Sequence, residues 1–118
     1  MKSAMSESVL KIHASNTDRI GNDLLYEYIV YLAKKKGLAG VTVYRGIMGY
    51  GMSSGAVTST KFWELTEKLP VLIEIIDKRE KLEEFYSIIE PELIRMPKGC
   101  LVTIEPVEVL LRKPGKKI

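Results

Sequence analysis

Cysteine, histidine and glutamine are almost missing from this chain of 118 residues, which contains one, one and none of them respectively. Since Cys100 is alone, no intrachain disulfide can form, and we expect a reducing, cytoplasmic setting. The one histidine, His13, has no second histidine or cysteine cluster with which to bind zinc, so no metal site and no required cofactor are predicted. No apolar run approaches the roughly 20 residues that a membrane-spanning helix needs.

The sequence also offers little that could serve nucleophilic or acid–base catalysis. Ser53 and Ser54 lie among glycines, but no base accompanies them, and the acidic residues are too scattered to predict a carboxylate pair. No set of nucleophile, base and orienting group is apparent. We therefore expect that the protein is not an enzyme.

The length corresponds to one domain, which can bury roughly two-thirds of the surface that its unfolded chain exposes. We expect that domain at residues 8–112, between a flexible tail at 1–7, which lacks the apolar stretch of a secretion signal, and a basic tail at 113–118. The net charge of +3 is too small to indicate nucleic acid as a partner. Nucleic acid is disfavoured further because Tyr44 has no second aromatic residue with which to form a stacking platform on the expected sheet.

Strand and helix patterns alternate along the chain in the order βαββαβ. The first helix is expected to begin at an Asn22 cap and to end at Gly37. The second is expected to open with the pair Asp77 and Glu80, and Pro91 should kink or end it. Strands are expected at residues 9–14, 40–47, 69–76 and 100–111, the last one bulged near Glu105 and Pro106.

This element order predicts an α+β fold, a ferredoxin-like βαββαβ sandwich. Right-handed crossovers then give a four-stranded antiparallel sheet with both helices on one face. The helix positions expected in the core recur at helical spacing, and they are Leu25, Tyr28, Ile29, Leu32, Ala33, Leu82, Phe85, Tyr86 and Ile89.

The other face of the sheet is expected to be partly apolar and uncovered. If Val71, Ile73 and Ile75 face the helices, the opposite face carries Leu72, Glu74, Ile76, Tyr44 and either Val102 or Thr103. Scattered apolar residues are tolerated on a monomer, but a patch of this kind more often marks an interface. We therefore expect an oligomer that packs sheet faces together.

The segment at residues 45–55 contains four glycines in eleven residues. Such a density indicates backbone that takes positive φ or closely approaches another molecule. The topology brings this segment, the loop at 15–21 and the turn at 97–99 to one end of the sheet, where glycine N–H groups and Lys98 could hold an anion. Alternatively, the glycine segment is a hairpin that only needs positive φ, and Lys98 is a solvated turn lysine. Arg112 leaves the sheet opposite the glycine segment, so it is either a surface arginine or reaches the anion from a neighbouring subunit.

Several motifs resemble those of the PII signalling proteins and, more closely, those of their uncharacterised PII-like relatives, the family named domain of unknown function 190. The similarity extends from Val9 to Arg112. The motifs that carry it are Leu24-Leu25-Tyr26-Glu27, Gly37-Leu38-Ala39-Gly40, Arg45-Gly46, Gly49-Tyr50-Gly51, Leu69-Pro70-Val71, Lys98-Gly99 and the closing run at 107–112.

The resemblance implies a homotrimeric regulatory protein of signal transduction, with three clefts between subunits that each bind an adenine nucleotide. Gly49, Tyr50 and Gly51 match a glycine-phenylalanine-glycine turn that meets the ligand in PII proteins, and Met52 follows it. Lys98 and Gly99 match the phosphate-binding turn of PII proteins, and Arg112 matches the first arginine of their closing segment.

The chain departs from the PII pattern in ways that favour AMP or ADP over ATP. Lys98 precedes its glycine, Cys100 replaces a lysine, Pro114 replaces the second closing arginine, and the loop after the second strand is much shorter. Relatives often accompany membrane transporters or channels, so the resemblance implies such a partner. The alternative function is a small nucleotide-processing enzyme that uses the same cleft.

Overall fold

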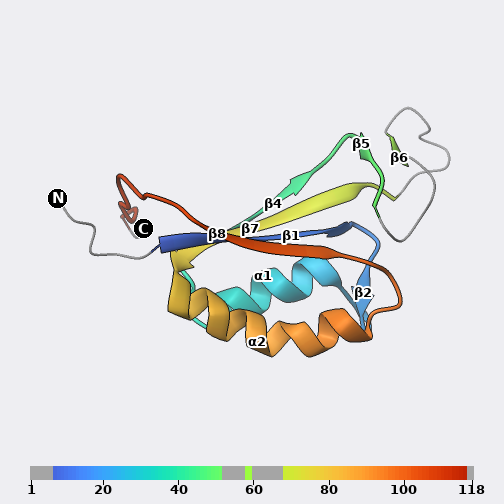
Figure 1. Ribbon diagram of the computed structural model, residues 1–118, viewed down its shortest axis with the longest axis horizontal. Helices are drawn as coiled ribbons and strands as arrows, with labels where there is room; N and C mark the ends of the chain where they lie inside the picture. Colours follow the sequence, from blue (N-terminus) through green and yellow to red (C-terminus); the bar gives the residue numbers. More distant parts are fainter. Residues whose placement is uncertain (1–6, 52–57, 60–67, 117–118) are drawn as a thin grey trace.

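The computed structural model describes residues 7–51, 58–59 and 68–116. It contains a four-stranded antiparallel sheet in the order β4-β7-β1-β8, with both helices on one face (Figure 1). The predicted ferredoxin-like sandwich is therefore confirmed. Its elements are β1 (Glu7–Ser15), α1 (Leu25–Lys35), β4 (Val41–Arg45), β7 (Pro70–Lys78), α2 (Arg79–Arg95) and β8 (Leu101–Pro106), with two small hairpins, β2 (Arg19–Ile20) with β3 (Asp23–Leu24) and β5 (Met48–Gly49) with β6 (Thr58–Ser59).

Strict alternation along β7 separates the two faces of the sheet. Val71, Ile73 and Ile75 are buried beneath the helices, while the residues between them are only partly buried on the other face, as the sequence predicts. The register Lys11↔Thr103 places Thr103 on that open face, so Val102 is the one that packs against the core. The high β propensity of these residues and this alternation of apolar positions explain why β7 forms here.

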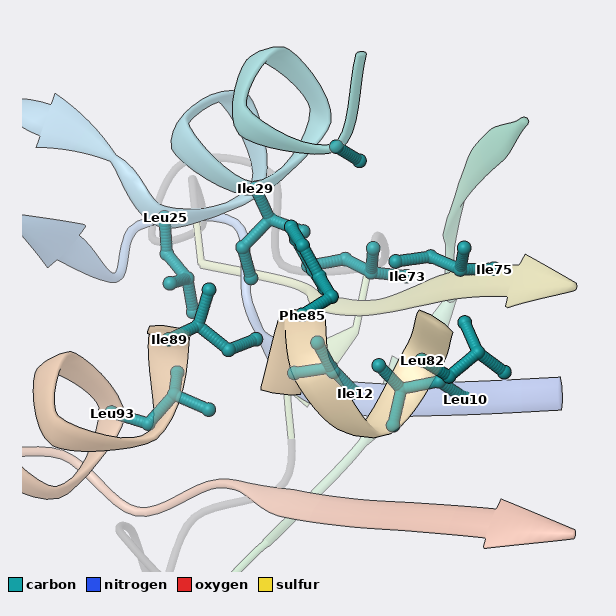
Figure 2. Packing of buried hydrophobic residues seen from close by; sticks show 11 residues of the cluster. Leu10, Ile12, Leu25, Ile29, Ile73, Ile75, Leu82, Phe85, Ile89 and Leu93 are labelled. Carbon is teal, nitrogen blue, oxygen red and sulfur yellow. The ribbon is translucent and has the colours of Figure 1, made fainter. Parts of the chain in front are cut away.

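The core lies between the sheet and the two helices. Figure 2 shows side chains from α1 and α2 converging on those of β1 and β7, with Phe85 among them. The predicted helix positions are confirmed: Tyr28, Leu32 and Tyr86 are partly buried, and the fully buried ones are Leu25, Ile29, Ala33, Leu82, Phe85 and Ile89. Burial of these apolar side chains is the main term that holds the helices on the sheet.

The predicted cap of α1 at Asn22 is wrong. Asn22 lies in the turn of the β2–β3 hairpin after Gly21, whose φ is 62°, and its carbonyl oxygen accepts a hydrogen bond from Arg19 at 2.9 Å. The helix begins only at Leu25, whose backbone N–H donates to the carbonyl oxygen of Asp18 at 2.8 Å. The intervening chain therefore closes on itself as a hairpin before it turns into the helix.

Asp77 does not cap α2 either. The helix begins at Arg79 without a side-chain cap, and Asp77 is buried. Its carboxylate accepts hydrogen bonds from the backbone N–H groups of Ala39 at 2.9 Å and Lys78 at 2.7 Å, and Lys81 Nζ lies 3.7 Å away. Asp77 thus joins the loop after α1 to the end of β7. The local sequence pattern could not predict this hydrogen bond, because Ala39 is 38 residues away in the sequence.

Two further element ends differ from the predicted ones. Pro91 lies inside α2, so an end of the helix at this proline is wrong, whereas a kink there stays a prediction; the helix continues to Arg95, and its last turns carry the buried Leu93. The last strand ends at Pro106, not at residue 111, because proline cannot donate to the sheet and the chain then leaves it. Beyond it, Val107 N–H still donates to the carbonyl oxygen of Glu7 in β1 at 3.1 Å. The predicted stop of α1 at Gly37, with φ of 81°, is confirmed.

Substitution of Asp77 should destabilise the fold. Asp77→Ala removes the buried carboxylate that accepts the partly buried hydrogen bonds of the Ala39 and Lys78 N–H groups, so we expect the free energy of unfolding to fall by about 1–3 kcal/mol in urea titration. Glu80→Ala is the control, because Glu80 is exposed in the first turn of the same helix and should change stability by less than about 0.5 kcal/mol. Equal effects of both substitutions would contradict the structural role of Asp77.

Candidate functional site

One end of the sheet gathers the segments in which the sequence predicts an anion site. The pairings Ser15↔Pro70, Arg45↔Val71 and His13↔Leu101 show that β1 and β4 end where β7 and β8 begin. The loop after β1, the glycine segment after β4 and the turn before β8 therefore share this end, as predicted (Figure 1). We call it the glycine end.

The same topology keeps two of these segments apart within one chain. Strands β4 and β8 are the opposite edges of the sheet, so their ends are three strand spacings apart, about 14 Å. Gly49 to Gly51 follow the first edge and Lys98 and Gly99 precede the other, which is too far for one phosphate group to contact both. The predicted cradle is thus present at one end of the sheet but divided between its two edges.

The glycine segment is packed against Pro70 at the start of β7. Gly46 N–H donates to the carbonyl oxygen of Pro70 at 2.7 Å, and a Cβ at Gly46 would lie 2.9 Å from Pro70 Cγ. None of Gly46, Gly49 and Gly51 has positive φ. The close approach of Pro70, a residue of the same chain, therefore explains why position 46 is a glycine. The alternative prediction, a hairpin whose glycines need positive φ, is not supported at these three positions.

Beyond Gly46 the segment presents apolar side chains to solvent. Ile47 and Met48 are exposed, and the predicted ligand residue Tyr50 is 76% exposed. Gly49 belongs to β5, where it pairs with Thr58 of β6, and a Cβ on Gly51 would meet no atom within 4 Å. Tyr50 thus offers an open aromatic ring between two glycines, while Met52, the last residue predicted in this group, lies outside the described residues.

The base of the glycine end is held by a pair of hydrogen bonds that sequence reasoning missed. Asn16 N–H donates to the carbonyl oxygen of Leu69 at 2.9 Å, and Leu69 N–H donates to Asn16 Oδ1 at 2.8 Å. Asp18, which is buried, accepts from Ser15 N–H at 2.9 Å. The run Ser-Asn-Thr-Asp after a strand could have predicted these hydrogen bonds, because such side chains commonly form hydrogen bonds with nearby backbone groups.

On the other edge, Lys98 and Gly99 form an exposed turn between α2 and β8. Lys98 makes no ion pair with another described residue, so its ammonium group is available to an anion. The adjoining Cys100 is half-buried, and burial, with a smaller effect of the Asp18 carboxylate, raises the pKa of its thiol. The thiol is therefore protonated at neutral pH and serves as a packing group, not a nucleophile.

Arg112 lies at the opposite end of the sheet. Its Nη2 is 2.7 Å from Oε1 of Glu7, the first residue of β1, whose side chain is largely buried. The nine residues of β1 span about 26 Å, so Arg112 cannot reach the glycine end of its own chain. Any role of Arg112 at a ligand there requires a neighbouring copy, as the sequence predicts.

The open face carries one polar contact of note. Tyr44 hydroxyl donates to Glu74 Oε1 at 3.2 Å, and this hydrogen bond raises the pKa of the Tyr44 phenol. Thr42 lies opposite Glu74 in the register, so Tyr44, two residues further along β4, reaches Glu74 diagonally.

Two kinds of site are missing from the part of the chain that the structure describes. No group of three or more histidine, cysteine, aspartate or glutamate side chains there could hold a metal ion. None of its helices has the length and apolar character needed to cross a membrane. What the described glycine end offers chemically is main-chain N–H groups, an aromatic ring and a lysine.

Comparisons with known proteins identify relatives along almost the whole chain. The family model DUF190, described as an uncharacterized ACR, matches residues 7–109. A UPF0166 protein of Aquifex aeolicus is 35% identical over 106 residues, which cover 90% of this chain and 95% of that protein. A UPF0166 protein of Methanocaldococcus jannaschii is 35% identical over 86 residues, or 70% of this chain and 78% of the relative.

Solved structures with the same fold belong to PII-like proteins. One is CPII, a nitrogen regulatory PII-like protein from Thiomonas intermedia K12, bound to ADP, AMP and bicarbonate; it aligns with a TM-score of 0.53 at 14% identity, over 89% of this chain and 96% of CPII. A second CPII structure, bound to ADP and bicarbonate, aligns with a TM-score of 0.52 over 88% and 93% of the two chains. At this identity the likeness shows the fold alone. The chain belongs to the DUF190 family of UPF0166 proteins, and its fold is that of the PII-like proteins.

Proposed function

We propose that the protein is a PII-like regulator of signal transduction, a homotrimer that binds an adenine nucleotide, AMP or ADP, in clefts between its subunits. The observation that carries the proposal is the division of the glycine end. Gly49 to Gly51 and Lys98 with Gly99 lie at one end of the sheet but on opposite edges. Two copies placed edge to edge bring the glycine turn of one against the lysine turn of the other. The binding of ADP and AMP by CPII, which has this fold, supports the choice of ligand.

Each group in the proposed cleft has a chemical task. Backbone N–H groups around Gly49 and Gly51 bind phosphate oxygens, since the missing side chains let the ligand approach the main chain. Lys98 adds a charge-assisted hydrogen bond to phosphate, and Gly99 keeps that turn open. Tyr50, and Met52 after it, provide apolar surface for the base. Arg112 of an adjoining copy supplies a second cation, and neither a metal nor a further cofactor is needed.

The proposed output is a change of contact with another protein. Nucleotide bound at Gly49 to Gly51 would change the conformation of the glycine segment and so the surface that it presents to a partner. Ile47 and Met48 at its base are exposed apolar residues of the kind that partner surfaces use. We propose a cytoplasmic protein whose partner is a membrane transporter or channel.

An enzyme that processes a nucleotide in the same cleft is the second candidate, and one sequence feature favours it. The run from Gly51 to Gly55 matches the Gly-x-Ser-x-Gly pattern of hydrolase nucleophile turns, with Ser53 at the serine. That pattern requires a helix after the turn, whereas the next described residues form strand β6. The one histidine of the chain, His13, lies on the open sheet face in β1. These placements favour binding without turnover.

Calorimetry with AMP, ADP, ATP and cyclic nucleotides tests binding directly. We expect AMP or ADP to bind, and Lys98→Ala to raise the dissociation constant by about tenfold or more, because a charge-assisted bond to phosphate is lost. Lys34→Ala is the matched control, since Lys34 is an exposed lysine in the last turn of α1, away from the glycine end. Absence of binding across the nucleotides would contradict the proposal.

A pair of substitutions distinguishes the two roles open to Arg112. If Arg112 serves an adjoining cleft, Arg112→Ala weakens nucleotide binding, whereas Glu7→Gln leaves it unchanged or strengthens it by releasing the guanidinium group. If Arg112 acts only through its ion pair, both substitutions have the same effect. Dissociation constants from the same calorimetry decide between these outcomes.

Incubation with each nucleotide, followed by chromatography of the products, tests the enzyme alternative. We expect the nucleotide to be recovered intact, because the one histidine, His13, lies on the open sheet face in β1 and not in the glycine or lysine turn, and the Asp18 carboxylate is buried and accepts from Ser15 N–H. Sustained turnover that Ser53→Ala abolishes would contradict the regulatory proposal and establish the enzyme.

A further inference from the structure

The exposed side of α1 carries a hollow with a volume of about 290 Å³. Figure 1 shows both helices on one side of the sheet, with no described segment beyond them. The residues that line the hollow come from α1 and from β3 just before it, and they are Asp23, Glu27, Tyr28, Tyr31, Leu32 and Lys35. We call this set the α1 surface.

The middle of the α1 surface is aromatic and apolar. Tyr31 is 70% exposed, and Tyr28 and Leu32 are half-buried. Tyr28 lies one helical turn before both of the others, so the three side chains are neighbours on the helix. An exposed aromatic ring beside a hollow is the kind of group that anchors a contact between proteins.

The two ends of the α1 surface carry opposite charges. Asp23 and Glu27 lie where the helix begins, and Lys35 lies in its last turn. Glu27 and Lys35 are four residues before and four residues after Tyr31, about 12 Å apart along the helix, so they cannot pair with each other. None of the three charged residues forms an ion pair with another described residue.

The other helix differs in this respect. Each basic residue of α2 has an acidic partner within the chain, and the pairs are Arg79 with Glu83, Lys81 with Asp77 and Arg95 with Glu92. The α1 surface instead leaves charges of both signs unpaired around an exposed ring. These charges are therefore available to another molecule.

We propose that the α1 surfaces of two copies pack against each other about a two-fold axis that passes beside Tyr31. Such an axis between antiparallel helices places residues at equal distances before and after it opposite each other. Glu27 of each copy then faces Lys35 of the other, and each Tyr31 enters the hollow over Tyr28 and Leu32 of the other copy. The charge pattern is thus complementary to itself, which favours a second copy as the occupant.

This contact goes beyond the proposed function and does not depend on it. Both helices lie on one face of the sheet, so the contact leaves the open face free for the packing of sheet faces that the sequence predicts. The contact joins two assemblies that already exist, or two single chains where none exists. In either case it at least doubles the mass of the particle.

Charge reversal tests the contact in the full chain, by light scattering after gel filtration at low ionic strength, where surface charges are least screened. Glu27→Lys and Lys35→Glu each place like charges at both ends of the contact. We expect each to raise the protein concentration needed for this association by about tenfold or more, and the two substitutions in one chain to restore it. Glu84→Lys is the matched control, because Glu84 is exposed on α2 outside the α1 surface; it should associate like wild type.

A mixture of the two single variants tests the antiparallel arrangement. The Glu27→Lys chain is basic at both positions and the Lys35→Glu chain is acidic at both, so a mixed pair again joins opposite charges at both ends. We expect the mixture to associate at concentrations at which neither variant does so alone. Recovery cannot come from a repaired fold, because each chain keeps its own substitution. Failure to recover would contradict the two-fold contact and indicate a different partner for this surface.

A cysteine near the axis gives a covalent test that does not require a strong contact. Tyr31→Cys in a Cys100→Ser chain should form a disulfide between two copies under mild oxidation, because packed helices hold such positions at Cα separations of about 5 Å, within reach of a disulfide. Ile94→Cys in the same background is the control, since Ile94 is 76% exposed on α2 and lies outside the α1 surface. Equal crosslinking of the two variants would contradict the contact.

The measured masses separate failure of this contact from failure of the proposed function. If wild type and Glu27→Lys are both trimers, the contact is removed and the nucleotide clefts remain. If wild type is a dimer and Glu27→Lys a monomer, the contact is established and the homotrimer is contradicted. A wild type with at least twice the mass of a trimeric Glu27→Lys variant would support both.

Discussion

The antiparallel pairing of β1 with both β7 and β8 is the constraint on which the rest of the structure depends. Together with the pairing of β4 and β7, it places β1 and β7 inside the sheet and β4 and β8 at its opposite edges. The glycine turn and the lysine turn consequently reach the same end without meeting. For the same reason the chain after β8 finishes beside Glu7, remote from the glycine end. A single copy therefore contains every group of the proposed cleft but cannot assemble them, which ties ligand binding to association.

The glycine end combines a fixed base with an open tip. Asn16 and Leu69 exchange two hydrogen bonds, and Gly46 lies so close to Pro70 that a side chain there would collide with it. Gly46 is thus required for packing, whereas Tyr50 and Gly51 project into solvent beyond the last point of contact. A binding element gains from such an arrangement, because a rigid base limits the conformational entropy that the tip loses when a ligand orders it.

Periodicity was sufficient to predict the fold, because the buried positions of β7 and of both helices alternate or recur with the spacing of their element. Local pattern failed where a side chain has a distant partner. Asp77 resembles a helix cap but accepts from Ala39, 38 residues away, and Arg112 pairs with Glu7, 105 residues away. The site residues were predicted from motifs, and their convergence at one end followed from topology. Their separation on two edges became apparent only from the strand order, and their contact with a ligand stays a prediction.

The central claim is that an adenine nucleotide binds where adjoining copies meet. A crystal structure of the protein with AMP or ADP tests it most directly. The account predicts phosphate oxygens within hydrogen-bond distance of the main chain at Gly49 to Gly51 of one copy, with Lys98 or Arg112 of an adjoining copy completing the site. Nucleotide bound entirely within one copy, or away from the glycine end, would contradict it.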